Sequence, residues 1–155
     1  MLEELTAGFP ILSCILFLPV VGAAVLWLFE EEDMVRTSAL TIALVELALS
    51  VFVLLRFVPE SAAMQFTERV PWIPALGISY HLAVDGISVL FVGLTAFLMV
   101  LVVVYSWDTI RHQVKLYMMC LLALETTTMG VFVSLDLILF FVFWELMLIP
   151  SYFLI

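Results

Sequence analysis

The sequence predicts an all-α integral membrane protein with about five transmembrane helices. Hydrophobic residues make up 66% of the chain and charged residues only 12%, and the mean hydropathy is +1.28. Soluble domains are roughly half apolar and a quarter charged, so a soluble fold is excluded. The apolar residues also form unbroken runs without the polar alternation of barrel strands, which favours helices.

Each helix follows from the length of its apolar run. Crossing about 30 Å of hydrocarbon at about 1.5 Å per residue takes about 20 residues. The runs that meet this length cover residues 9–29, 38–55, 86–107, 116–135 and 137–155. The first run follows acidic residues and exceeds the apolar core of a signal peptide, so we expect a retained helix. The short link VSLDL predicts that the last two helices form an antiparallel hairpin.

The connections divide the chain into three parts. Residues 1–58 hold the first two helices, residues 59–85 form an extramembrane connection, and residues 86–155 hold helices three to five. The connection reads QFTERVPWIPALGISYHL near its middle, which predicts two short extended pieces around a Pro-containing turn, lying on the membrane surface. The chain stops at Ile155 without a polar cap, so a missing C-terminal part is expected.

The charged residues indicate sidedness and exclude some partners. The formal net charge of -9 comes mostly from the acidic stretches MLEEL and FEEEDM in the first third of the chain, and it disfavours nucleic acid as a partner. With five spans, three basic residues share one side and two share the other with the N-terminus: Arg36, Arg111 and Lys115 against Arg56 and Arg69. The excess of basic residues predicts that the N-terminus is on the periplasmic or lumenal side.

Three carboxylates lie inside apolar runs and are the candidate proton-translocating residues. Counted from the start of each run, Glu46, Glu125 and Glu145 lie roughly 12 to 14 Å deep, near the midplane. A charge at that depth costs about 2.5 to 3.5 kcal/mol, so each acid needs a partner, water or a proton. Burial favours the neutral acid and a nearby cation favours the carboxylate, which is the chemistry of a proton relay. The alternative is a permanently neutral Glu that bonds two helices.

The neighbours of these acids strengthen two of the three assignments. Pro150 has no N–H, so the carbonyl of Leu146 beside Glu145 loses its helical partner and a kink is expected there. Three threonines follow Glu125, and their hydroxyl groups can bond the preceding turn or hold water. We expect Thr128, three residues on, to share the face of Glu125.

The remaining polar residues and the cysteines are assigned smaller roles. His81 and Asp85 lie near a helix end and are candidates for proton uptake or release, with a solvated or capping role as the alternative. Cys14 and Cys120 have no metal-ligand or redox spacing and are read as buried filler. The sequence contains no phosphate loop, nucleophile elbow or metal-ligand cluster, so we expect no metal, no bound cofactor and no self-contained active site.

The runs SLDLILFFVFWELMLIPSYFLI and VPWIPALGISYHLAVDGIS resemble the antiporter-like M subunit (chain 4) of complex I, called NdhD in the NDH-1 complex. The resemblance implies the N-terminal part of a fold with about fourteen transmembrane helices and two inverted five-helix repeats. It implies further that residues 86–155 start the first repeat, and that Glu145 is the family's functional glutamate. The lysine that pairs with this glutamate would lie on a later helix, beyond Ile155.

The resemblance also implies function, location and partners. The chain would be a proton-translocating, non-redox subunit of an NAD(P)H- or ferredoxin-quinone oxidoreductase, with quinone, flavin and iron–sulfur centres in other subunits. Its partners would be other membrane-arm subunits, including neighbouring antiporter-like ones, in a bacterial inner or cyanobacterial thylakoid membrane. The alternatives are a subunit of a Mrp-type cation/proton antiporter and a scaffold subunit that no longer pumps. For Glu46 and Glu125 the resemblance supplies no role, and an acid chain that feeds Glu145 is a hypothesis based on depth.

Overall fold

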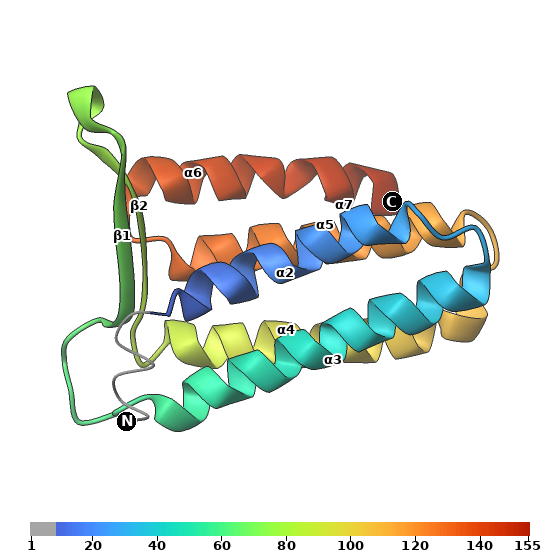
Figure 1. Ribbon diagram of the computed structural model, residues 1–155, viewed down its shortest axis with the longest axis horizontal. Coiled ribbons are helices and arrows are strands. Elements are labelled where there is room, and N and C mark those ends of the chain that lie inside the picture. The colour runs from blue at the N-terminus through green and yellow to red at the C-terminus, as the bar shows by residue number, and fades with distance from the viewer. Residues whose placement is uncertain (1–8) are drawn as a thin grey trace.

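The computed structural model describes residues 9–155, which form a bundle of antiparallel helices with one β-hairpin across its end (Figure 1). The element order is α2 (Ile11–Leu26), α3 (Glu32–Arg56), β1 (Gln65–Ile73), a 3-10 turn η1 (Pro74–Leu76), β2 (Ile78–Val84), α4 (Ser88–Thr109), α5 (Val114–Val133), α6 (Leu137–Leu146) and α7 (Leu148–Leu154). The N-terminus, whose side of the membrane the sequence predicts, lies outside the described residues.

Within residues 9–155, four stretches of helix are long and apolar enough to cross a membrane: Glu32–Arg56, Ser88–Thr109, Val114–Val133 and Leu137–Leu154. Helix α2 has only 16 residues, so the first predicted span is shorter than expected. The chain from Trp27 to Phe29 continues with hydrogen bonds to carbonyls three residues back, which makes tight turns in place of further α-helix. These helices make the protein an integral membrane protein.

Helix α3 begins six residues before the start that hydropathy alone predicts. Its first turn contains Glu32 and Asp33, whose negative charges suit the free N–H groups of a helix start. Arg36 lies 3.4 Å from each of these two carboxylates and donates a hydrogen bond to the carbonyl of Ile110. Charged residues therefore extend the helix and tie it to the α4–α5 link.

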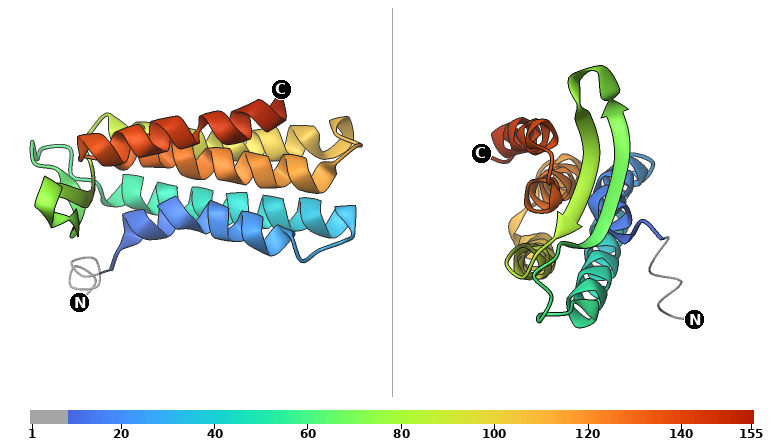
Figure 2. Two further views of the ribbon diagram at one scale, coloured as in Figure 1. Left: turned by 90° about the horizontal axis from the view of Figure 1, so that it is seen from above. Right: turned by 90° about the vertical axis from the view of Figure 1, so that its left-hand side faces the viewer.

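The connection contains an antiparallel hairpin formed by β1 and β2. Its register pairs Gln65 with Val84 and Val70 with Tyr80. Gly77 after η1 has a φ of 71°, a left-handed conformation that glycine adopts without strain. Figure 2 shows the hairpin crossing one end of the bundle, with its turn projecting beyond the helices.

Helix α5 is the centre of the bundle and packs against α2, α3, α4, α6 and α7. Its contact with α6 depends on Gly130, where an added Cβ atom would lie 2.3 Å from the Phe143 ring. The outer faces of the other helices expose large apolar side chains such as Leu90, Leu98 and Val104. These exposed faces suit contact with lipid or with further helices.

Two carboxylates attach the hairpin to the bundle. Glu68 on β1 accepts hydrogen bonds from the backbone N–H groups of Leu12 (2.7 Å) and Ser13 (3.1 Å) at the start of α2. It also accepts one from the Ser13 hydroxyl, which lies 2.7 Å from the Tyr80 hydroxyl on β2. The start of α2 therefore contacts both strands.

Asp136 forms the second attachment, at the start of α6. It accepts hydrogen bonds from the backbone N–H groups of Ile138 in its own helix and Ser79 on β2, both at 2.9 Å. Beside it, the N–H of Leu135 donates to the carbonyl of His81. The bond from the Ser79 backbone is the main reason that the pKa of Asp136 is below its ordinary value.

Candidate functional site: two buried carboxylates between α3 and α5

Helix α3 presents one buried stripe to the bundle, and Glu46 is part of it. The buried residues recur every three or four positions: Val35, Ala39, Ala43, Glu46, Ser50 and Val53. This spacing defines one helix face, so Glu46 points the same way as the apolar residues around it. Its exposed fraction is 0%.

Helix α5 carries an equivalent stripe that contains Glu125. Its members are Val114, Met118, Leu122, Glu125, Met129 and Val133, and Glu125 is also fully buried. Helices α3 and α5 are in contact and run in the same direction, toward the hairpin (Figure 1). Both acids therefore lie at buried positions of two helices that contact each other.

The oxygens of this pair have no protein partner. All four carboxyl oxygens of Glu46 and Glu125 are buried without a hydrogen bond to the protein. The hydroxyl groups of Ser50 and Thr126, also buried, are in the same condition. Buried polar groups in folded proteins nearly always have a partner, so this group of side chains is exceptional.

The other threonines are already bonded. Thr127 donates to the carbonyls of Ala123 and Leu124, and Thr128 donates to the carbonyl of Leu124. Thr126, rather than Thr128, therefore has the free hydroxyl group beside Glu125. The sequence analysis did not identify Ser50, although its position one turn after Glu46 on a helix was the signal that could have found it.

Glu145 lies on a different face and does not join this pair within the chain. Phe143 faces α5, where it contacts Gly130. Glu145 is two residues further on, about 200° around the helix, and is exposed together with Trp144. The structure thus brings two of the three predicted acids together and leaves the third on the outer surface of the bundle.

Pro150 lies where the last helix is interrupted. The helix is divided at Met147 between α6 and α7, and Pro150, four residues after Leu146, offers no N–H to that carbonyl. The division is adjacent to Glu145, so the backbone beside that acid differs from a regular helix.

His81 and Asp85 lie at the hairpin end of the bundle. Asp85 accepts hydrogen bonds from the N–H groups of Ile87 and Ser88 and so stabilises the turn that leads into α4. These bonds, above all the one from Ser88, lower the pKa of Asp85 below its ordinary value. His81 is part of β2, beside Arg69 on β1.

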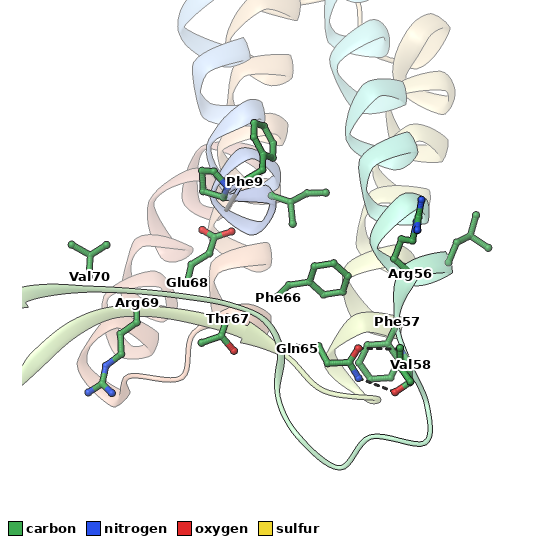
Figure 3. Close-up of a pocket in the computed structure, with 13 residues that line it drawn as sticks. Phe9, Arg56, Phe57, Val58, Gln65, Phe66, Thr67, Glu68, Arg69 and Val70 are labelled. Carbon is green, nitrogen blue, oxygen red and sulfur yellow. Dashed lines mark hydrogen bonds between the residues drawn. The ribbon is translucent and has the colours of Figure 1, made fainter. Parts of the chain in front are cut away.

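A groove lies elsewhere, between the start of α2, the end of α3 and β1 (Figure 3). Its lining includes Arg56, Gln65, Glu68 and Arg69. In Figure 3 the two arginines point away from each other, and the Gln65 amide is bonded to the backbone of Val58. None of the predicted proton-translocating acids lines this groove.

Comparison with known proteins identifies the relatives of this bundle. The chain is 42% identical over 151 residues to NADH-quinone oxidoreductase subunit M of Rhodobacter capsulatus, a match that covers 94% of the chain and 29% of that protein. It is homologous to these M subunits over almost its whole length. NAD(P)H-quinone oxidoreductase chain 4 2 of Thermosynechococcus vestitus is 39% identical over 150 residues, covering 95% of the chain and 28% of the relative.

The fold agrees with this homology. Respiratory complex I from Thermus thermophilus with bound NADH contains a chain that matches with a TM-score of 0.75 and 25% identity. The match covers 92% of this chain and 28% of the other. The expected family resemblance is thereby confirmed, although no protein-family model matches the sequence. The chain spans less than a third of the length of the relatives it matches.

Proposed function

We propose that this chain is part of a proton-translocating, non-redox subunit in the membrane arm of an NAD(P)H- or ferredoxin-quinone oxidoreductase. The observation that carries the proposal is its homology to M subunits over 94% of its length. Residues 86–155 would start the first of the two repeats in this subunit, and its partners would be the other membrane-arm subunits of the same complex.

Glu145 is the proposed proton-loading group. It is an ionisable side chain on an apolar helix, beside the division at Met147, and it is exposed on the surface of the bundle. An acid on the membrane-spanning surface of a bundle requires a further protein segment or water around it. In the whole protein this acid would therefore face other helices. A cation on one of them would favour the ionised carboxylate when it is near and the protonated acid when it moves away. Glu125 and Glu46 would contribute to proton transfer from within the bundle, and His81 and Asp85 would serve proton uptake or release.

The test is proton pumping with Glu145→Gln in the full-length protein. Membrane vesicles would be assayed for proton uptake and for quinone-linked electron transfer, with assembly of the complex checked in parallel. We expect assembly to persist while pumping and coupled turnover fall at least tenfold, because glutamine keeps the shape of glutamate but cannot take up the proton. Glu60→Gln, an exposed acid in the connection, is the matched control and should pump normally.

Two outcomes would contradict the proposal. Pumping at the normal level with Glu145→Gln would assign the chain to a scaffold role. Exchange of Na⁺ or K⁺ for protons without an electron donor or quinone would assign it to a Mrp-type antiporter.

A further inference from the structure

Six buried polar atoms on the two contacting helices α3 and α5 lack a protein partner. They are the four carboxyl oxygens of Glu46 and Glu125, the Ser50 hydroxyl and the Thr126 hydroxyl. All four residues are more than nine-tenths buried. An unbonded buried polar group costs about 1 to 3 kcal/mol, so the native protein must bond these atoms to something other than its own side chains.

The hydroxyl groups of Ser50 and Thr126 indicate which side of each helix would contact a bound molecule. Ser50 follows Glu46 by four residues, so both project from one face of α3 toward the same neighbours. Thr126 follows Glu125 directly, a quarter turn around α5. The two acids supply hydrogen-bond acceptors and the two unbonded hydroxyl groups supply donors, which is a combination that can bind a small polar molecule between α3 and α5.

No cation in the described residues neutralises this pair. Helix α2 contains no charged residue, and the one charge of α4, Asp108, lies at its far end. On α3 the nearest cations are Arg36 and Arg56, each ten residues from Glu46, or about 15 Å along the helix. On α5 the nearest is Lys115, which bonds the Trp27 carbonyl.

Acids on the remaining elements lie away from the pair. On α6, Glu145 is exposed, and α7 carries no charge. Two ionised carboxylates that face each other without a cation repel strongly in an apolar interior, so one of them must hold a proton.

We propose that Glu46 and Glu125 form a single proton-binding site that holds one proton between their two carboxyl groups and binds a water molecule oriented by Ser50 and Thr126. When one carboxylate takes up a proton it becomes a carboxylic acid, whose O–H group donates to the other carboxylate directly or through the water. The hydroxyl groups of Ser50 and Thr126 bond this water, and the water in turn donates to the carboxyl oxygens. The site is separate from Glu145, and only its use during pumping depends on the function proposed above.

The experiment is infrared spectroscopy of the assembled complex that contains the full-length protein, in H₂O and in D₂O. A protonated carboxyl group gives a carbonyl stretching band that shifts in D₂O, and a carboxylate does not. Difference spectra between the natural protein and Glu46→Gln, Glu125→Gln and the double variant isolate this band from other carboxyl groups. Glu145→Gln is the matched control, since it removes a carboxyl group of the same chain outside the pair.

We expect one band from the pair. Either single variant should shift the band of the remaining acid, because its hydrogen-bond partner has changed, and the double variant should abolish it. Ser50→Ala should shift the band without removing it, because the water loses one partner. The Glu145→Gln variant should leave the band unchanged.

Three results would overturn the proposal. The first is a natural protein that shows no protonated carboxyl band at all, a result that needs no variant, or a double variant whose spectrum equals that of the natural protein. The second is a separate band for each acid, with each single variant removing one and leaving the other in place. The third is a band that disappears on addition of Na⁺ or K⁺, which would identify a cation site. If the band behaves as expected while Glu145→Gln still pumps, the proton site stands and the function proposed above fails.

Discussion

The acids at the hairpin end of the bundle and the acids in its interior are bonded in opposite ways. Glu68 and Asp136 each accept hydrogen bonds from at least two backbone N–H groups, and they join parts of the chain more than fifty residues apart. Glu46 and Glu125 accept none from the protein. Side chains with every oxygen engaged stabilise the fold, whereas side chains with every oxygen free are available for chemistry.

The strongest test of this contrast compares Glu68→Ala with Glu46→Gln. Alanine at position 68 leaves the N–H groups of Leu12 and Ser13 without their charged acceptor. We expect the free energy of unfolding to fall by about 1 to 3 kcal/mol. Glutamine at position 46 keeps the shape of glutamate, and its amide N–H can still donate to Glu125 or to the water, so it should change the stability by less. Thermal unfolding of the assembled complex measures both, supported by hydrogen exchange at the start of α2. Equal losses in the two variants would show that the interior acid is as structural as the hairpin acid.

A smaller effect, and one that depends on pH, is expected at Asp136. Its pKa in the folded protein is below the ordinary 3.8, chiefly because the backbone of Ser79 donates to it. A group with a lowered pKa adds stability above its unfolded pKa, and this stability disappears as the pH falls through the folded value. Protection of the Ser79 amide against hydrogen exchange should therefore drop as the pH falls below about 4, the unperturbed value of an aspartate.

Asp136→Asn sharpens this result, because the amide cannot titrate. In this variant the Ser79 amide should be less protected against hydrogen exchange at neutral pH than in the natural protein. Its protection should not decrease further as the pH falls. Parallel pH profiles for the two proteins would mean that another group controls the attachment of β2 to α6.

Hydropathy in the sequence was sufficient to predict most of the helices, because spanning a membrane is mainly a matter of apolar length. It missed the start of α3, where Glu32, Asp33 and Arg36 extend the helix by charge. It overestimated α2, where the last apolar residues continue into tight turns after Leu26. Helix boundaries depend on caps and local bonds, which an average over apolar residues does not register.

The sequence predicted the acids of the candidate site but not which of them meet, because that also depends on local packing. Depth along each run selected the three acids, and the spacing of buried positions on α3 could have added Ser50. Which acids meet depends on how each helix is rotated, and for α6 that rotation is set by the contact of Phe143 with Gly130. The bonds of Glu68 to Ser13 and of Asp136 to Ser79 cross more than fifty residues and have no local sequence signal.

The smallest expected effect tests the same contrast at a neutral side chain. Tyr80→Phe removes one hydroxyl group, which lies 2.7 Å from the Ser13 hydroxyl, and keeps the ring that stacks against Phe17. Because the bond is neutral and partly exposed, we expect a loss of about 0.5 to 1.5 kcal/mol.

Burial raises the pKa of Tyr80 above its ordinary 10.0. The neutral hydroxyl group therefore supplies its full stability below pH 10, the unfolded pKa, and this stability is lost as the pH rises through the raised pKa of the folded protein. Thermal unfolding should thus separate the two proteins near neutral pH and bring them together in strong alkali. If the gap between the natural protein and Tyr80→Phe persists unchanged in alkali, Ser13 bonds the ionised oxygen as well, and the hairpin end would be held by charge at Tyr80 as it is at Glu68 and Asp136.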